Sequence, residues 1–281
     1  MPRVAIVVDS ASDLSPEDAA RNGIAQVPLL VTFGSTEYRT GIDLSTERFW
    51  QMMTAPGAPF PKTAACSPGD FQAAFQTAFD AGAESIVCIT VGGKLSATVK
   101  SAAIARDQMA SRDIRVVDSE TASYGFGLLA IMASEMAGAG VSVDEIQATI
   151  ERRKGDSHLY VVLETLEYLK RGGRISAAKA AIGGILSVKP IITIEAGVVE
   201  TADQPRTRSK ARERLLELIT GRPIERAVVL SAQAADADTF ATELTARAAL
   251  RSGSVPVRSI GPSVGPHVGP GAYGAVVIYR S

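Results

Sequence analysis

Arg174 stands in a sequence context that points to anion binding. It directly follows Gly172 and Gly173 in the tract LEYLKRGGRIS, and a nearly uncharged run rich in Ala, Gly and Ile comes after it. A guanidinium group keeps its charge, so beside apolar sequence it needs either water or a fixed anion. Glycines allow the backbone to approach a ligand closely or to take a positive φ. The tract therefore predicts an anion held by Arg174 at the mouth of an apolar space.

A purely structural interpretation of the same tract is also open. A pair of glycines is typical of the end of a helix, here one over residues 165–170, and Arg174 would then lie on the surface. The run behind it, residues 176–187, would form either the wall of a tunnel or a closely packed helix of small residues.

His267 is the second candidate for chemistry. It lies in GPSVGPHVGPGAYG, residues 261–274, where five glycines and three prolines in fourteen residues predict a rigid, irregular loop. Loops carry functional residues more often than regular elements do, which favours a role for this histidine. The alternative is a solvated loop histidine. His158, at the start of a predicted strand, is interpreted as structural.

Hydroxyl side chains occupy two further turns. Ser96 and Thr98 lie in VGGKLSATVKSA, a turn that opens a helix, where free N–H groups and hydroxyls can hold a carboxylate or a phosphate. Ser96 would otherwise serve only as the N-cap. Thr63, in PKTAACSPGDF, is expected at the sheet edge where open α/β folds bind ligands. Asp9 and Asp118 end strands at that edge and are interpreted as acids that bond loop backbone.

Signatures of nucleotide and metal chemistry are missing. The sequence has no P-loop, no GxSxG motif around Ser96 and no cluster of metal ligands. Residues 125–130 match a dinucleotide-binding pattern, but no acid closes a second strand about twenty residues on, so we interpret these glycines as helix packing. We therefore expect neither a metal nor a cofactor.

The composition is that of a globular protein. Of 281 residues, 46% are hydrophobic and 21% charged, with a net charge of −1, which disfavours both disorder and nucleic acid binding. Cys66 and Cys88 lie far apart, so neither a disulfide nor a zinc site is indicated. No run of eighteen apolar residues exists, and the N-terminal MPRVAIVVDS is typical of a strand and not of a signal peptide. We expect a cytoplasmic protein.

Strands and helices are predicted to alternate along the first half. The expected strands are 3–9, 25–33, 85–91 and 114–118, and serine caps predict helices after Ser15, Ser45, Ser67 and Ser142. This alternation indicates a mostly parallel sheet with helices on both faces. A charged stretch at 151–157 marks the expected boundary between domains 1–155 and 156–281.

The second half predicts a mixed α/β sheet domain. Residues 190–194 and 198–201 suggest a β-hairpin around Glu195-Ala196-Gly197. The other expected elements are strands 158–163, 226–232, 255–260 and 272–280, and helices 206–219 and 236–251.

The candidate residues occur in an order that resembles the DegV family. Leu95-Ser96-Ala97-Thr98 is similar to the family's LSGT-like turn, and Thr63 lies in a segment similar to its threonine motif. The resemblance runs end to end, and its motifs are Asp9-Ser10, Thr63, residues 95–98, residues 117–119, LEYLKRGGRIS with KPII, Arg206-Thr207 and residues 267–271. This family includes the fatty-acid-binding subunits of bacterial fatty acid kinase.

The resemblance implies a two-domain α/β carrier that is not an enzyme by itself. It would enclose one long-chain fatty acid, with the carboxyl group at the domain junction, and a separate dihydroxyacetone-kinase-like subunit would phosphorylate that carboxyl with ATP. Ser96 and Thr63 would hydrogen-bond the carboxyl group, with Arg174 and His267 beside it. Arg206 matches a family arginine near the site. Transient contact with a membrane surface would allow lipid exchange.

The chain departs from the family motifs at some positions. Alanine replaces the glycine after Ser96, residues 64–66 change the middle of the threonine motif, and Val268 replaces a common threonine. Two alternatives from other functional classes stay open. One is a serine hydrolase with Ser96 as nucleophile and His267 as base. The other is a binding module for a phosphorylated metabolite.

Overall fold

A four-stranded parallel sheet organises the first half of the chain. The computed structural model describes residues 3–175, 188–248 and 253–280. The sheet has the order β2-β1-β6-β7, and every neighbouring pair is parallel. Its strands are β1 (Val4–Asp9), β2 (Ile24–Val27), β6 (Ser85–Thr90) and β7 (Asp113–Asp118).

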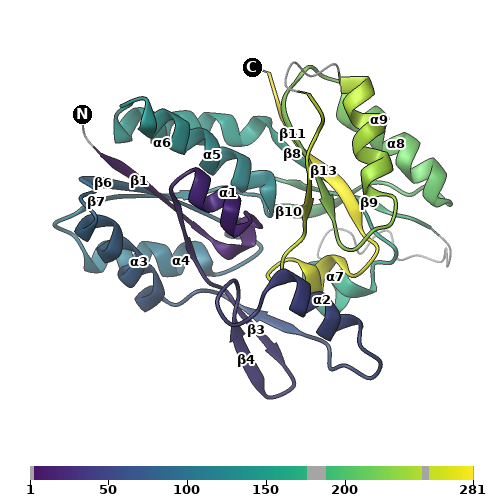
Figure 1. Ribbon diagram of the computed structural model, residues 1–281, viewed down its shortest axis with the longest axis horizontal. Helices are drawn as coiled ribbons and strands as arrows, with labels where there is room; N and C mark the ends of the chain where they lie inside the picture. Colours follow the sequence, from purple (N-terminus) through teal and green to yellow (C-terminus); the bar gives the residue numbers. More distant parts are fainter. Residues whose placement is uncertain (1–2, 176–187, 249–252, 281) are drawn as a thin grey trace.

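Helices cover both faces of this sheet, as predicted (Figure 1). One face carries α3 (Pro68–Asp80) and α4 (Thr98–Gln108), and the other carries α5 (Tyr124–Gly138) and α6 (Val143–Arg153). The serine caps are confirmed, because the side chains of Ser15, Ser67 and Ser142 each accept a backbone N–H of the helix that follows, α1 (Pro16–Arg21), α3 and α6 respectively. Gly127 of α5 packs against Ser12, where a Cβ atom would lie 2.9 Å from the backbone oxygen. This supports the interpretation of these glycines as helix packing.

The single strand expected over residues 25–33 was wrong. The chain leaves the parallel sheet after Val27 and enters a separate antiparallel sheet at β3 (Leu30–Phe33). Pro28 lies between them, and because proline has no N–H it cannot continue a strand ladder. The order of this second sheet is β4-β3-β5, with β4 (Thr36–Arg39) and β5 (Lys62–Ala64), and α2 (Thr46–Thr54) lies between β4 and β5 in the chain.

The second half forms a mixed six-stranded sheet, which confirms the predicted class. Its order is β10-β9-β8-β13-β11-β12, and β11 pairs parallel to β12 while all other neighbours are antiparallel. The hairpin turn is confirmed at Ala196-Gly197, where both residues have positive φ. The strands are β8 (Ser157–Val162), β9 (Ile191–Glu195), β10 (Val198–Asp203), β11 (Ile224–Ser231), β12 (Val257–Ser259) and β13 (Tyr273–Tyr279).

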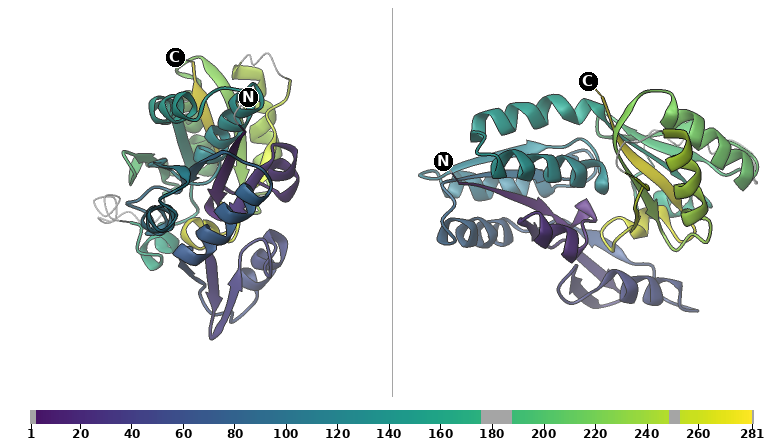
Figure 2. Two further views of the ribbon diagram at one scale, coloured as in Figure 1. Left: turned by 90° about the vertical axis from the view of Figure 1, so that its left-hand side faces the viewer. Right: turned by 45° about the horizontal axis from the view of Figure 1, so that its top comes forward.

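Side chains alternate between the two faces of the mixed sheet, so the sheet contributes to a separate apolar core on each face. Tyr273, Ala275 and Val277 of β13 pack beneath α8 (Arg208–Thr220) and α9 (Ala237–Ala248). Val276 and Ile278 point the other way and join a core that continues into the first half of the chain. The sheet therefore faces the first half with one apolar side (Figure 2). Because that core is shared, the division at residues 155/156 stays a prediction.

Two carboxylates, of the buried Asp9 and the half-buried Asp118, hold the loops at the ends of the parallel strands. The Asp9 side chain accepts the backbone N–H groups of Ala11 and Val91, at 2.9 and 2.7 Å. Burial raises the pKa of Asp9 to about 7. Asp118 accepts the N–H groups of Gly93 and Glu120. The interpretation of both acids as structural is confirmed, and the loop over residues 91–96 is held in place by them.

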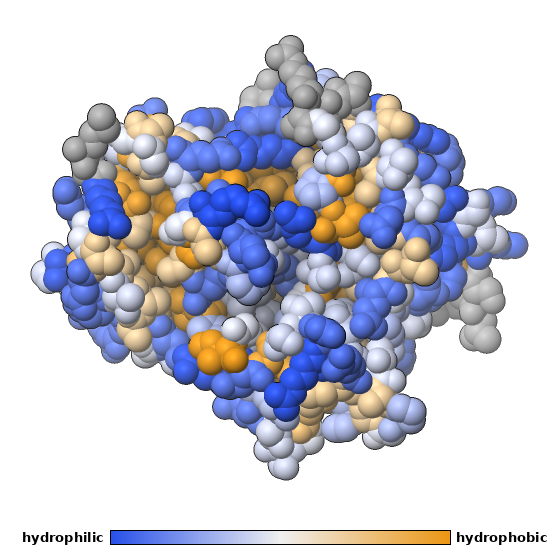
Figure 3. Space-filling view, viewed as in Figure 1, coloured by the Kyte–Doolittle hydropathy of each residue, from blue (hydrophilic) through white to orange (hydrophobic). Residues whose placement is uncertain are grey.

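Hydrophilic side chains cover most of the face drawn in Figure 3, and hydrophobic ones gather mainly in recesses. Among the described residues, the large hydrophobic side chains that are exposed are Ile42 and Ile104. None of the described helices is long and apolar enough to cross a bilayer.

Candidate functional site

Arg174 is positioned by the end of α7 (Glu167–Arg171). Gly173 has φ +72°, the Gly173 N–H bonds the Lys170 carbonyl at 3.1 Å, and the Arg174 N–H bonds the Leu169 carbonyl at 3.0 Å. This pair of bonds is a Schellman motif, which needs a glycine in the left-handed conformation. The glycine cap of the structural interpretation is thus confirmed, but its placement of Arg174 on the surface is wrong, because the side chain is half-buried and donates to backbone carbonyls.

The Arg174 guanidinium is half-buried and has no acidic partner among the residues that the structure describes. Its Nε donates to the Leu95 carbonyl at 3.0 Å and its Nη1 donates to the Gly172 carbonyl at 2.8 Å. Burial lowers the pKa of Arg174 from its usual value. Binding of an anion beside a half-buried guanidinium that lacks an acidic partner is energetically favourable.

His267 lies on a short helix, α10 (Gly265–Val268), and not in the irregular loop predicted over residues 261–274. The prolines and glycines permit this turn, since Pro266 occupies one of the first helical positions and Gly269 ends the helix with φ +75°. Helix α10 packs against α7. A Cβ atom at Gly269 would lie within 2.6 Å of the Tyr168 ring carbons, so this close approach requires glycine.

Gly172 makes the equivalent close approach to His267. A Cβ atom there would lie 2.9 Å from the His267 Cε1 atom and closer still to Nδ1. The imidazole is thereby held over the end of α7, with its Nε2 atom 3.2 Å from the Thr63 Oγ1 atom. Its buried Nδ1 atom has no hydrogen-bond partner among the described residues. Burial, together with the charge of Arg174, lowers the pKa of His267 to about 4.

Thr63 reaches the site from the small antiparallel sheet. It lies on β5, paired with Val31 of β3, and is 204 residues from His267 in the chain. No local pattern predicts that contact, because it depends on how the small sheet packs against the second half of the chain. The structure therefore brings together two of the residues that the sequence had singled out separately.

Ser96 and Thr98 have different positions. Ser96 lies at the cavity surface, whereas Thr98 is fully buried behind it and does not line the cavity. The Thr98 Oγ1 atom lies 2.8 Å from the Ser96 Oγ atom, and the Thr98 N–H donates to Ser96 Oγ at 3.3 Å. Thr98 is thus placed to orient Ser96. The N-cap of α4 is Ala97, which has no side-chain acceptor, so the alternative of Ser96 as N-cap was wrong.

A cavity lies within the shared core between the parallel sheet and the mixed sheet. Its empty volume is about 820 Å³ when its open mouth is included. Most of the lining is aliphatic and comes from both halves of the chain, which fits the alternation of β8, β9 and β11. The apolar lining includes Leu29, Val91, Leu159, Val161, Ile192, Ile194, Val199, Leu230 and Ile260.

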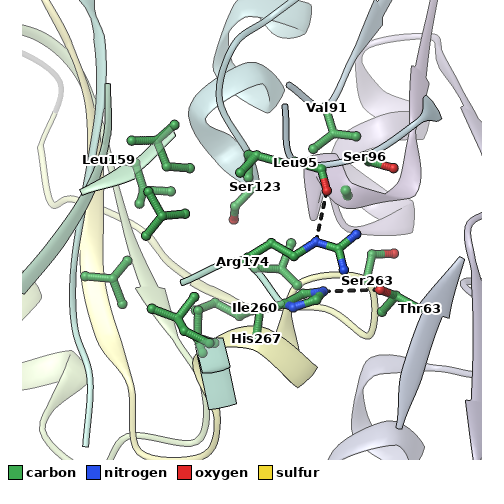
Figure 4. Close-up of a pocket in the computed structure, with 18 of the residues that line it drawn as sticks. Thr63, Val91, Leu95, Ser96, Ser123, Leu159, Arg174, Ile260, Ser263 and His267 are labelled. Carbon is green, nitrogen blue, oxygen red and sulfur yellow. Dashed lines mark hydrogen bonds between the residues drawn. The ribbon is translucent and has the colours of Figure 1, made fainter. Parts of the chain in front are cut away.

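Most of the polar side chains that line this cavity lie at one end, while Ser123 lies nearer the middle of the view in Figure 4 and donates its hydroxyl to Asp13. In Figure 4, Thr63, Ser96, Arg174, Ser263 and His267 lie on one side of the view, and Leu159 lies with other carbon-only side chains on the opposite side. Ser263 escaped the sequence analysis, although it stands in the same glycine- and proline-rich segment as His267. The cavity is therefore amphipathic, as a ligand with a long apolar part and an anionic end requires.

Arg206 is not brought to this cavity. Its side chain is exposed, just before the Thr207 N-cap of α8, and it does not line the cavity. Arg208, two residues on, points inward instead. It forms ion pairs with Asp236 and Glu164 and donates to the Gly271 carbonyl at 3.0 Å. Placing Arg206 beside the anion is thus unsupported by the geometry, because the chain turns into α8 at this point.

A hydrolase site is not assembled. His267 Nε2 contacts Thr63 and Ser96 Oγ contacts Thr98, so the two proposed catalytic side chains share no hydrogen bond among those described. No acid orients the imidazole among the described residues, since its Nδ1 atom is unpartnered there. Within residues 3–175, 188–248 and 253–280, no cluster of His, Cys, Asp or Glu could hold a metal ion.

The unusual pKa of His267 can be checked directly because the chain has two histidines. In protein stripped of ligand, we expect the His267 imidazole to stay neutral until the pH falls to about 4. A carboxylate bound beside Arg174 would offset the arginine charge and raise this pKa. Histidine C–H signals followed by NMR against pH, with His267→Gln for assignment, measure both values. A His267 signal that titrates near 6.5 in the stripped protein would contradict this geometry.

Comparison with known proteins agrees with this architecture. A sequence profile described as "Uncharacterised protein, DegV family" matches residues 3–280. A DegV domain-containing protein of Caldanaerobacter subterraneus is 35% identical over 282 residues, which cover 98% of each chain.

Two solved structures are similar over nearly their whole length. A fatty-acid-binding DegV family protein from Thermus thermophilus has a TM-score of 0.91 at 34% identity, covering 99% of this chain and 100% of that one. A stearic-acid-binding protein from Eubacterium ventriosum has a TM-score of 0.87 at 26% identity, covering 99% and 98%. Because the profile and these relatives span almost all of the sequence, the chain belongs to the DegV family.

Proposed function

We propose that this protein is a carrier that encloses one long-chain fatty acid and presents the carboxyl group to a separate ATP-dependent kinase. One observation carries the proposal: the core cavity is aliphatic along its length, and at its polar end lies Arg174, without an acidic partner among the described residues. Fatty acid binding by the DegV proteins of Thermus thermophilus and Eubacterium ventriosum supports it.

The acyl chain would supply most of the affinity. Each methylene group transferred from water to an apolar site contributes about 0.8 kcal/mol, so a sixteen-carbon chain contributes on the order of 10 kcal/mol before the costs of binding. Side chains such as Leu159, Ile192 and Leu230 provide the aliphatic surface. Residues 176–187, which the sequence predicted to form either a tunnel wall or a closely packed helix, lie outside the described residues.

The carboxylate would be held by two hydroxyls and Arg174. The Thr98 N–H donates a hydrogen bond to Ser96 Oγ. When the Thr98 hydroxyl also donates to Ser96 Oγ, the hydroxyl proton of Ser96 is free to bond a ligand. The imidazole tautomer with its proton on Nε2 donates to Thr63 and leaves the Thr63 proton for a ligand in the same way. A carboxylate with charged and neutral donors of this kind can be buried without a large desolvation penalty.

Phosphorylation would need no base from this protein. An oxygen of the ionised carboxylate attacks the γ-phosphorus of ATP, the bond from that phosphorus to the β,γ-bridging oxygen breaks, and ADP leaves with its electron pair. The acyl phosphate and ADP together carry the charge of the reactants, so no proton is transferred. A neutral His267 suits a hydrogen-bonding role in this scheme. The kinase subunit, similar to dihydroxyacetone kinases, would bring ATP, Mg²⁺ and the phosphoryl-transfer machinery.

Protein purified from its natural host should contain about one fatty acid per chain. Denaturing extraction followed by mass spectrometry identifies the ligand and its amount. Stripped protein should rebind palmitate with submicromolar affinity, because the apolar contribution exceeds the cost of association. Protein that is empty and also fails to bind any long-chain fatty acid would refute the carrier function.

The kinase partnership has a separate readout in the same preparation. With fatty acid, ATP and the kinase subunit, trapping by hydroxylamine should yield an acyl hydroxamate, and either protein alone should yield none. Hydroxamate formed by the carrier alone would contradict the proposal that a separate kinase subunit carries out the phosphorylation. Cytoplasmic location and transient membrane contact for lipid exchange remain part of this proposal.

A further inference from the structure

A second hollow opens beside the polar end of the cavity. It lies between the loop that precedes α4, the end of α7 and the β9–β10 hairpin, and its empty volume is about 780 Å³ including space open to solvent. Leu95, Ser96, Arg174 and Val199 line both spaces, so the cleft continues from the cavity. Unlike the cavity, it is lined mainly by polar surface, and its remaining lining is Gly93, Lys94, Ala97, Lys100, Gly173, Gly197 and Val198.

The charged side chains that line this cleft, among the described residues, are all positive. Lys94, Lys100 and Arg174 line it, and its lining includes no acid among the described residues. The carboxylate of Asp118 lies behind Gly93, where it already accepts the N–H groups of Gly93 and Glu120. Three cations exceed what the single charge of a carboxylate requires, and they match the larger charge of a phosphate group.

Lys94 spans the two halves of the chain at this cleft. Its Nζ atom donates to the Ala196 carbonyl in the hairpin turn at 2.9 Å, and its aliphatic stem passes 3.6 Å from the position of a Cβ atom at Gly197. An ammonium group has three donors, so Lys94 can keep this bond and still bind an anion. Lys100 lies in the first turn of α4, close to the positive end of the helix dipole.

We propose that this cleft binds the phosphate group of an acyl phosphate whose acyl chain occupies the cavity, a role that rests on the carrier function proposed above. Ser96 and Arg174 form the boundary between the two spaces. An acyl carbonyl held there places the next bonded group, the phosphate, in the cleft and in reach of Lys94 and Lys100. The two lysines would thus contact the phosphate group, which the fatty acid itself lacks.

The test compares two ligands with the same acyl chain. Palmitate is one, and the other is the methylene phosphonate analogue of palmitoyl phosphate, in which a CH₂ group replaces the bridging oxygen. Lys94→Gln and Lys100→Gln should each weaken binding of the phosphonate about fivefold, and the double variant about 25-fold, as expected for one charge pair per lysine. Binding of palmitate should change less than twofold. Lys210→Gln, the same change on an exposed position of α8, should affect neither ligand.

The outcomes separate this inference from the carrier function. If wild-type protein binds neither ligand, the carrier function fails. If palmitate binds but the lysine variants leave the affinity ratio of the two ligands unchanged, only the phosphate site is refuted. Inorganic phosphate is the third probe: competition of free phosphate with the phosphonate supports the site. The acyl phosphate assignment is overturned if the lysines are needed to bind free phosphate but the protein binds the phosphonate no more tightly than palmitate.

Discussion

Replacing Arg174 with glutamine is expected to weaken the binding of a long-chain fatty acid about 30-fold to 150-fold, because a charge-assisted hydrogen bond in a partly buried site contributes about 2–3 kcal/mol. The guanidinium is half-buried and faces the polar end of the cavity. Glutamine keeps a donor and much of the length of the side chain, so the loss reports the charge. Displacement of a fluorescent fatty acid measures the affinity.

The matched control is Arg206→Gln, which removes an exposed arginine near the N-terminus of α8. Its affinity should stay within twofold of wild type, since Arg206 does not line the cavity. The free energy of unfolding of both variants should lie close to that of wild type. Equal losses of affinity in the two variants would show that Arg206 belongs to the site, as the sequence resemblance implied.

Replacing Gly172 with alanine is expected to destabilise the protein by about 1–3 kcal/mol and to reduce fatty acid affinity strongly. The added methyl group overlaps the His267 imidazole, which must leave its position beside Thr63. Movement of His267 also shifts α10, because this helix packs directly on α7. Urea unfolding measures the stability, and the NMR titration of His267 reports whether the imidazole has moved into solvent, where its pKa would rise toward 6.5.

Gly173→Ala separates steric overlap from backbone strain. Gly173 has φ +72° and nothing lies within 4 Å of its hypothetical Cβ atom. The left-handed conformation alone should cost about 1 kcal/mol, and His267 and the bound carboxylate should be unaffected. If the two glycine variants had the same affinity and the same His267 titration, the close approach of Gly172 to the imidazole would be disproved.

Local signals in the sequence predicted much of the fold. A serine cap depends on residues within one helical turn, and the capping side chains at Ser15, Ser67 and Ser142 form as expected. Buried parallel strands such as β6 appear as continuous apolar runs. The prediction failed at Pro28, where a strand-like run crosses from one sheet to another. Local β-propensity does not specify which sheet a strand joins.

The sequence by itself predicted the class of the site. A glycine directly before Arg174 predicts a Schellman cap, and the apolar strands, the hydroxyl-bearing turns and the arginine predict a ligand with an anionic end. Motif order also indicated the family. These features depend on residue type and on neighbours a few positions away, so they can be predicted without coordinates.

Only the tertiary structure decided which of the candidate residues act together. It joined Thr63 to His267 across 204 residues, set Thr98 behind Ser96, left Arg206 exposed and added Ser263. It also made Gly172 indispensable for the approach of His267, although a glycine cap needs only Gly173. The physical reason is that such contacts arise from the packing of whole elements, α7 on α10 and β5 beside α10, and the chain between them carries no local signal of the approach.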